Sequence, residues 1–433
     1  MKFWHGNEVV SEAGHEPART GFDSARHGAH AIGGGRSWLR SKLYLPLAAV
    51  ALVGAACGSS NTASSTSTTS GANSSTASTS GGSSSSSLAT IKSQLTALEA
   101  IPTFTAPGPA ISASKLAGKS IVIINGDPSA APPAQTVNGV VAAAKAAGLQ
   151  STVLNGSSSQ VAVYTQLLDQ AIARKPMAIV TVAVVPALVK TELQKAKSAG
   201  IPVIIGLQRY HSSPTGPNQL AGSVYYGFVT QPAPEEGTIL AEQVALDGPS
   251  NATVGFVTSN VIPLSPQIYD SFKAGLAKYC AGCKIVDTQN VDPSNWVGSL
   301  TSTVSSMLSA NPNMNYIVPV FDGMAPFIIS ALGTSGGGHN VKVITTQGSV
   351  GAAMSAVQKG TFLSDVGQSS AWDGWALVDQ ALRAGLGLPP ETNPNIPLRL
   401  VMAAQLQGTN ASSDSAIYGT SYVQGFKKLW GLG

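Results

Sequence analysis

Short apolar runs alternate with longer segments of helical spacing over most of the chain. Four runs rich in β-branched residues are typical of buried strands, and the first three are each followed by a helical pattern. The helix expected at 186–199 begins with proline and stops before a glycine, as helix ends often do. These strands are expected at 120–126, 150–155, 178–184 and 202–207, with helices at 137–147, 161–174 and 186–199.

The same rhythm returns in the second half of the chain, before a further helix at 372–384 and a late strand at 398–403. Strands that alternate with helices predict a parallel sheet covered on both faces. The sequence therefore predicts an α/β fold of two similar doubly wound parallel-sheet lobes, with a hinge and an interlobe cleft. The repeated strands are expected at 253–258, 284–288, 316–321, 341–346 and 362–368, with helices at 265–278, 296–309, 324–332 and 350–358.

An apolar run at 43–56 follows three basic residues between 36 and 42 and ends at Cys57. Roughly 14 residues make about 21 Å of helix, which is short of a bilayer core of about 30 Å. This is the length of a signal-peptide apolar region. The end of the run resembles a bacterial lipobox, with Gly54 where leucine is usual, so we expect lipidation at Cys57. An ordinary secretory signal and a short membrane anchor are the alternatives.

The tract that follows Cys57 is almost entirely serine, threonine, glycine, alanine and asparagine. Such a composition cannot bury enough apolar area to offset the entropy of ordering, so we expect a disordered tether. The body is then held at the outer face of the cytoplasmic membrane or in the periplasm. The expected divisions are a leader (1–57), a linker (58–87), a helix with a proline-containing segment (88–111), a first lobe (112–230 plus 369–397) and a second lobe with its tail (231–368 plus 398–433).

Composition removes several classes of function. The 433-residue chain is 11% charged with a net charge of +4 and has no basic patch with interleaved aromatics, which argues against nucleic-acid binding. Histidine, cysteine and carboxylate residues show no metal-ligand spacing, so neither a metal nor a cofactor is expected. The G-x-S-x-G match at 333–337 follows an expected helix, whereas a nucleophile elbow follows a strand. We therefore expect no enzyme.

The pair Cys280 and Cys283 lies between an expected helix end and an expected strand of an exported chain. Gly282 can adopt the left-handed conformation that a turn there needs. We expect a structural disulfide across this turn. A redox-active dithiol and two free thiols are the alternatives.

Several segments in order, among them GKSIVIING, LLDQAIARKPMAIVTVAV, ELQKAKSAGIPVIIGLQ and WDGWALVDQALRAGLG, resemble the type I periplasmic binding proteins, in their sugar-binding branch. The resemblance implies a monomeric receptor that holds a small polar ligand between two lobes and delivers it to the permease of an ABC importer. It also implies chain crossings near 228–234, 367–370 and 397–398. A receptor of the same fold that feeds a sensor kinase or chemoreceptor is the alternative.

Polar residues at the carboxyl ends of expected strands are the natural ligand contacts, because ligands of such sheets bind beyond those ends. By resemblance, the first loop and the fourth strand end supply the family's sugar-binding positions, although several clamping side chains differ from the family pattern. The ligand class is left open among an unusual sugar, a polyol and another small molecule. The expected contacts are Asn125, Asp127, Gln208, Arg209, Tyr210, Phe321, Asp322, Gln347, Gln368 and Trp372.

Overall fold

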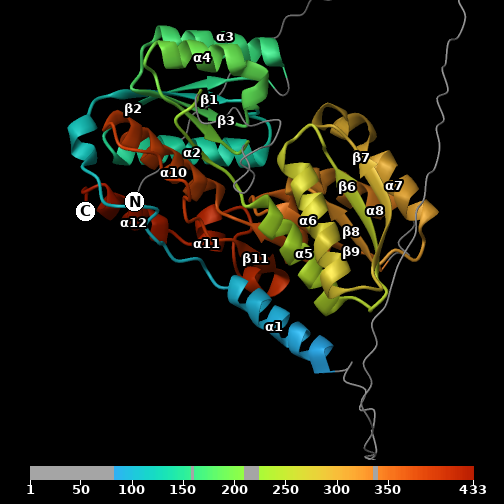
Figure 1. Ribbon diagram of the computed structural model, residues 1–433. Helices are drawn as coiled ribbons and strands as arrows, with labels where there is room; N and C mark the ends of the chain where they lie inside the picture. The colour runs from blue at the N-terminus through green and yellow to red at the C-terminus, as the bar shows by residue number, and fades with distance from the viewer. Residues whose placement is uncertain (1–81, 158–159, 209–223, 335–339) are drawn as a thin grey trace, which may run out of the picture. The chain divides into compact units, whose positions relative to one another are not determined.

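A computed structural model describes residues 82–433, with the exception of 158–159, 209–223 and 335–339 (Figure 1). These residues belong to one compact unit, Thr76–Gly433. The expectations for the leader, for Cys57 and for Arg209 and Tyr210 lie outside the described residues. No helix within the described ranges combines the length and apolar character that crossing a bilayer requires.

The first lobe is built on a five-stranded parallel sheet in the order β2-β1-β3-β4-β5. Its central strands β1 and β3 are almost fully buried, whereas the edge strand β2 alternates between exposed and half-buried residues. Burial on both faces explains why the central strands read as continuous apolar runs. The strands are β1 (Ser120–Asn125), β2 (Gln150–Asn155), β3 (Ala178–Val182), β4 (Val203–Gly206) and β5 (Gly227–Val229).

Two helical layers cover this sheet (Figure 1). Helices α3 (Val161–Ala173) and α4 (Lys190–Ser198) pack on one face, in a core with Val122 and Ile124. Helices α2 (Ala131–Ala146) and α10 (Ser370–Gly385) pack on the other face and contact each other extensively. Apolar side chains of neighbouring β1 residues point to opposite faces, and each face is buried under its own helices.

The second lobe has a six-stranded sheet in the order β11-β10-β9-β8-β6-β7. Its strands are parallel except for β11, which pairs antiparallel with β10. The two-lobed α/β architecture expected from the sequence is therefore confirmed, with this one antiparallel edge. The elements are α5 (Ala233–Asp247), β6 (Thr253–Thr258), α6 (Leu264–Tyr279), β7 (Lys284–Asn290), α7 (Thr301–Ala310), β8 (Tyr316–Pro319), α8 (Ala325–Thr334), β9 (Lys342–Gln347), α9 (Ala352–Gln358), β10 (Ser364–Gly367), β11 (Arg399–Met402) and α11 (Asp414–Tyr418).

The chain passes between the two cores at the three expected places, after β5, after β10 and before β11. The chain also crosses between the two cores at two places that the sequence analysis did not predict. Helix α1 (Gly82–Leu98) packs into the second core through Ile91 and Leu95, while Ile111 lies in the first core. This helix begins inside the tract that composition predicts to be disordered, because its later turns find apolar partners in the second lobe.

The carboxyl-terminal tail is the other unexpected passage. The sequence analysis placed the tail with the second lobe, and α11 does pack there through Ile417 and Tyr418. Helix α12 (Ser421–Leu429) instead packs into the first core through Tyr422 and Phe426. Tyr422 meets Trp375 edge-on and Phe426 stacks on it, with ring centroids 6.1 and 6.2 Å away. Contact with Trp375 of α10, which is distant in the sequence, therefore places α12 in the first lobe.

Cys280 and Cys283 form a disulfide at the turn between α6 and β7, with their Cα atoms 5.3 Å apart. The turn is also closed by a backbone hydrogen bond from the Cys283 amide to the Cys280 carbonyl. A Cβ on Gly282 would overlap the Ser250 carbonyl oxygen. The glycine is therefore required by close packing against the loop before β6, and its φ is not in the left-handed region that the sequence analysis assumed.

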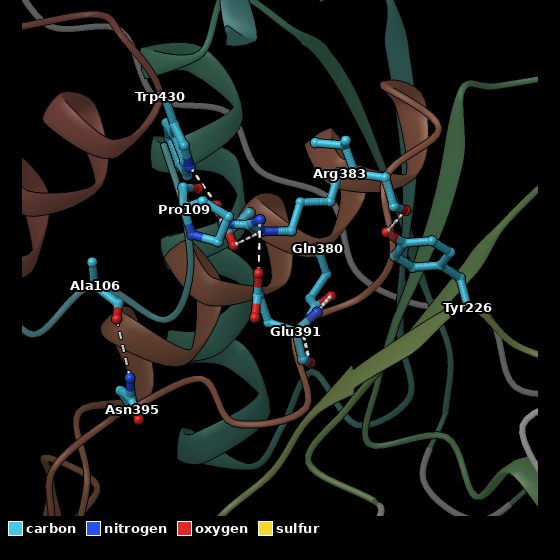
Figure 2. A network of polar contacts seen from close by, with 10 residues as sticks. Ala106, Pro109, Tyr226, Gln380, Arg383, Glu391, Asn395 and Trp430 are labelled. Carbon is cyan, nitrogen blue, oxygen red and sulfur yellow. Dashed lines mark hydrogen bonds and ion pairs between the residues drawn. The ribbon is translucent and has the colours of Figure 1, made fainter. Parts of the chain in front are cut away.

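A buried ion-pair network ties both terminal segments to α10 (Figure 2). Arg383 is 1% exposed and binds Asp379 and Glu391, each at 2.8 Å. Its remaining nitrogen donates to the Pro109 carbonyl at 3.0 Å, and the Trp430 indole donates to Asp379 at 2.8 Å. One guanidinium thus joins the segment that enters the first lobe, the helix α10 and the end of the tail.

Neighbouring hydrogen bonds extend this network along the loop after α10 (Figure 2). Gln380 binds both the carbonyl and the amide of Glu391, at 2.7 and 3.2 Å. Asn395 donates to the Ala106 carbonyl at 3.1 Å, and Tyr226 donates to the Leu388 carbonyl at 2.6 Å. The loop between α10 and β11 is consequently fixed to the first lobe by side chains and not by regular secondary structure.

Replacing Arg383 with alanine should destabilise the fold strongly. The change leaves the buried Asp379 carboxylate without its cation, and breaking a buried pair on one side costs about 3–5 kcal/mol. We expect the urea midpoint to fall in proportion, as measured by circular dichroism.

The matched control is Lys195→Ala, which removes the exposed pair between Lys195 and Asp169. Its midpoint should stay close to that of the wild type, because solvent screens such pairs. Equal midpoints for both variants and the wild type would contradict the role given to Arg383.

Candidate functional site

A cavity of about 320 Å³ is lined by residues of both lobes. Every lining segment lies at or just after the carboxyl end of a strand, except for Tyr164 on α3. The volume falls in the range of about 300–1,000 Å³ that small-molecule sites occupy. The first lobe contributes residues after β1, β3 and β4, and the second lobe contributes residues after β6, β7 and β8 and at the end of β9.

Five of the residues expected from the sequence meet in this cavity: Asp127, Gln208, Phe321, Asp322 and Gln347. They follow or end β1, β4, β8 and β9, so the carboxyl edges of the two sheets bring them together and not their place in the chain. The structure gives no ligand, and their role as ligand contacts stays a prediction.

Three other expected residues do not line the cavity. Asn125 is 3% exposed at the end of β1, below the cavity wall. Gln368 donates its amide to the carboxylate of Asp373 on α10. Trp372 is buried between Phe104 and Tyr422, with ring centroids 6.0 and 5.0 Å away.

The placement of Trp372 corrects the expectation that this ring faces the ligand. Helix α10 runs back into the first lobe, and Ser369 caps its amino terminus by accepting a hydrogen bond from the Trp372 amide at 3.0 Å. That cap directs the first turn towards the core. The terminal segments supply the stacking partners there, and no sequence pattern predicts where those segments pack.

Buried polar atoms from both lobes have no hydrogen-bond partner among the described residues. Those on residues that line the cavity are Gln208 Oε1 in the first lobe and Asp322 Oδ1, Asp292 Oδ1 and Gln347 Nε2 in the second. The side chains of Gln208, Asp322 and Gln347 are 9%, 4% and 7% exposed. A buried polar group without a partner costs about 1–3 kcal/mol. These atoms therefore favour a polar ligand that forms hydrogen bonds with them.

The turn that carries Gln347 is held from three sides. The Asp365 carboxylate accepts a hydrogen bond from the Gly348 amide at 3.1 Å, and the Tyr418 hydroxyl donates to the Gly348 carbonyl at 2.7 Å. The Asp322 carboxylate accepts from both the amide and the hydroxyl of Ser349. Gly348 has φ +69°, and a Cβ there would overlap the Tyr418 hydroxyl. These contacts fix the side chain of Gln347 at the cavity wall.

Three non-glycine residues that line the cavity have left-handed backbone: Ala183, Leu207 and Gln347, with φ of 59°, 65° and 99°. Each lies at or directly beyond the end of a strand, on β3, β4 and β9. Such conformations cost about 1–3 kcal/mol each and concentrate at functional sites, where the surrounding structure enforces them. Their gathering around one cavity is a second indication, independent of the polar atoms, that this is the working site.

Three carboxyl groups are buried behind the Gln347 turn. Burial raises the pKa of Asp322 to about 7, although the hydrogen bonds from Ser349 oppose the shift. Burial raises the pKa of Glu236 well above its usual value, and the nearby charge of Asp322 is the second cause of this rise. Burial and, to a smaller extent, the charge of Asp322 also raise the pKa of Asp365 well above its usual value. The group therefore resists carrying more than one negative charge at a time.

Asp322→Asn should change how stability depends on pH. A carboxyl whose pKa is higher in the folded chain favours folding while it is protonated, and that contribution is lost as the pH rises through the folded pKa. The wild type should lose stability between about pH 4 and pH 7. The variant keeps a neutral group throughout, so its free energy of unfolding relative to the wild type should rise by about 4 kcal/mol over this range.

Urea titrations at a series of pH values check this expectation. Asp270→Asn, at an exposed position on α6, is the control and should follow the wild type at every pH. Parallel curves for Asp322→Asn and the wild type would show that Asp322 is ionised without cost in the folded chain.

The sequence analysis missed most of the apolar lining, and Trp296 in particular. Trp296 follows β7, and its indole donates to the Val291 carbonyl at 2.9 Å. A Cβ on Gly323 would lie 3.4 Å from the ring, so the indole rests against the loop after β8. Periodicity assigned Trp296 to a helix, and its position directly after a strand end was the signal that could have identified it.

Comparison with known proteins places the chain in a family. Residues 111–387 match the model of the periplasmic binding protein domain, and the chain belongs to that family. A search among curated protein sequences found no match.

Solved structures share the fold at low sequence identity. One is an ABC transporter solute-binding protein from Agrobacterium vitis bound with α-D-tagatopyranose, at 21% identity and a TM-score of 0.59, covering 66% of this chain and 96% of that one. Another is a periplasmic solute-binding protein from Actinobacillus succinogenes with bound D-allose, at 20% identity and a TM-score of 0.59, covering 67% and 99%. A chain of the XylFII-LytSN complex matches at 18% identity and a TM-score of 0.55, covering 66% and 98%.

Proposed function

We propose that this protein is an extracytoplasmic solute-binding protein that holds a small polar ligand, a sugar or a sugar-like molecule, between its two lobes. The carrying observation is that residues of both lobes line one cavity, and that three of them, Gln208, Asp322 and Gln347, each hold a buried polar atom without a partner among the described residues. A ligand that bonds to Gln208 and Asp322 at once contacts both lobes and stabilises the state in which they are close.

The chemistry of the cavity suits a polyhydroxylated ring. Gln208 and Asp322 offer acceptors for hydroxyl groups, and Gln347 offers an amide donor. Phe321 provides aromatic surface for the apolar C–H faces of a ring. The sugars named for the two solute-binding proteins support this class of ligand for the present chain. The family and these structures are binding proteins, and we propose that this chain likewise performs no chemistry on its ligand.

Two finer parts of the proposal concern location and partner. Acylation of Cys57 and the tether after it would keep the binding unit at the membrane surface, where it delivers ligand to an ABC permease. A hydrogen bond from Gln135 of the first lobe to the Val350 carbonyl of the second links the lobes at 2.9 Å, and Gln231, in the crossing segment after β5, donates to the Gln347 carbonyl at 3.1 Å. Ligand-dependent change at such links would alter the surface that the permease meets.

The alternative is a ligand-sensing receptor that passes its state to a signalling protein. Its support is that a chain of similar fold occurs in the XylFII-LytSN complex. Ligand uptake by cells that lack the protein separates the two roles. Loss of uptake favours the importer, whereas normal uptake with a lost transcriptional response favours the sensor.

Titration calorimetry with D-allose, D-arabinose and D-tagatose tests binding directly. We expect at least one sugar to bind at a single site. Gln208→Ala and Gln347→Ala should each weaken that binding by about tenfold, since each removes one buried hydrogen bond worth about 1.4 kcal/mol.

The control is Gln150→Ala, which alters an exposed glutamine on β2 far from the cavity lining. It should leave the affinity unchanged. Failure of all three sugars and of related polyols to bind, or unchanged affinity in both cavity variants, would refute the proposal.

A further inference from the structure

The cavity changes character from its floor to its mouth. At the floor lie the buried polar side chains of Gln208, Asp322 and Gln347. At the mouth lie Leu188, from the segment after β3, and Val261, from the segment after β6. These two apolar side chains are 50% and 57% exposed, the highest values among the apolar residues that line the cavity. Each lobe therefore places one exposed apolar side chain at the cavity, and we call Leu188 and Val261 its lips.

Further apolar residues of both lobes line the cavity. They are Val185 in the first lobe and Ile262, Leu264 and Trp296 in the second. The Trp296 ring is fixed by its hydrogen bond to Val291 and cannot turn its indole nitrogen towards a ligand without losing that bond. A free monosaccharide, which carries hydroxyl groups around most of its ring, would match the floor and leave these apolar residues without an apolar partner.

We propose that the cavity takes a glycoside, or a molecule of the same design, whose polar ring occupies the floor and whose apolar substituent extends between Leu188 and Val261 across Trp296. This inference rests on the proposed function and narrows its ligand class. The acidic side chains of the described lining are Asp127, Asp292 and Asp322, and no basic side chain accompanies them among the described lining residues.

A simpler alternative is that Leu188 and Val261 contact each other when the lobes close. In that case the lips contribute equally to the binding of every ligand, whatever substituent it bears. If they instead contact the substituent, their contribution depends on its length, because each buried methylene adds to affinity. The dependence on chain length therefore separates the two uses.

The experiment compares methyl and hexyl glycosides of D-glucose, D-galactose and D-allose, in both anomers, together with the free sugars, by titration calorimetry. We expect at least one hexyl glycoside to bind about tenfold or more tightly than its methyl counterpart. Leu188→Ser and Val261→Ser should each remove about threefold or more of that advantage while changing methyl-glycoside affinity little.

The matched controls are Leu246→Ser and Val286→Ser, at partly exposed apolar positions on α5 and β7 outside the cavity, and both should keep the hexyl advantage. Sugars that bind without any hexyl advantage would overturn this inference and leave the proposed function standing. Equal losses for methyl and hexyl glycosides in the lip variants would do the same. Binding of neither sugars nor glycosides would overturn both.

Discussion

A helix that follows one parallel strand must carry the chain back across the sheet before the next strand can begin, so the loops after parallel strands gather at one edge. In this protein that constraint acts in both lobes, and the two edges line the same cavity. Residues as distant in sequence as Asp127 and Gln347 meet there for this reason. The polar floor, the left-handed strand ends and the apolar lips all follow from where the edges lie.

The floor is rigid because its strained turn is surrounded by groups that hold it. Gln347 can adopt a left-handed conformation only because the next two residues are bound by Asp322, Asp365 and Tyr418. Gathering carboxyl groups to do so raises their pKa values, which is an energetic cost of the arrangement. A site that has been built at this cost presents its polar atoms in fixed positions, and fixed positions reduce the entropy lost when a ligand binds.

The fold could be predicted from the sequence because the buried strands are continuous apolar runs separated by helices with proline and glycine at their ends. The same reasoning located Gln208, Asp322 and Gln347, since each lies at the end of an apolar run. Prediction from sequence patterns failed where tertiary contacts determine the structure. The three-residue strand β5 is too short to produce a pattern, and Trp372 faces the core because α12 returns to the first lobe. No local feature of the sequence indicates the pairing of β5 or the packing of α12 in the first lobe.

The central claim is that one small ligand is held by both lobes at once. A crystal structure of the protein with a sugar or glycoside that binds in solution tests it most directly. The account predicts that the ring lies within hydrogen-bond distance of Gln208 in the first lobe and of Asp322 in the second. A ligand that contacts one lobe alone, or that occupies a place outside this cavity, would contradict it.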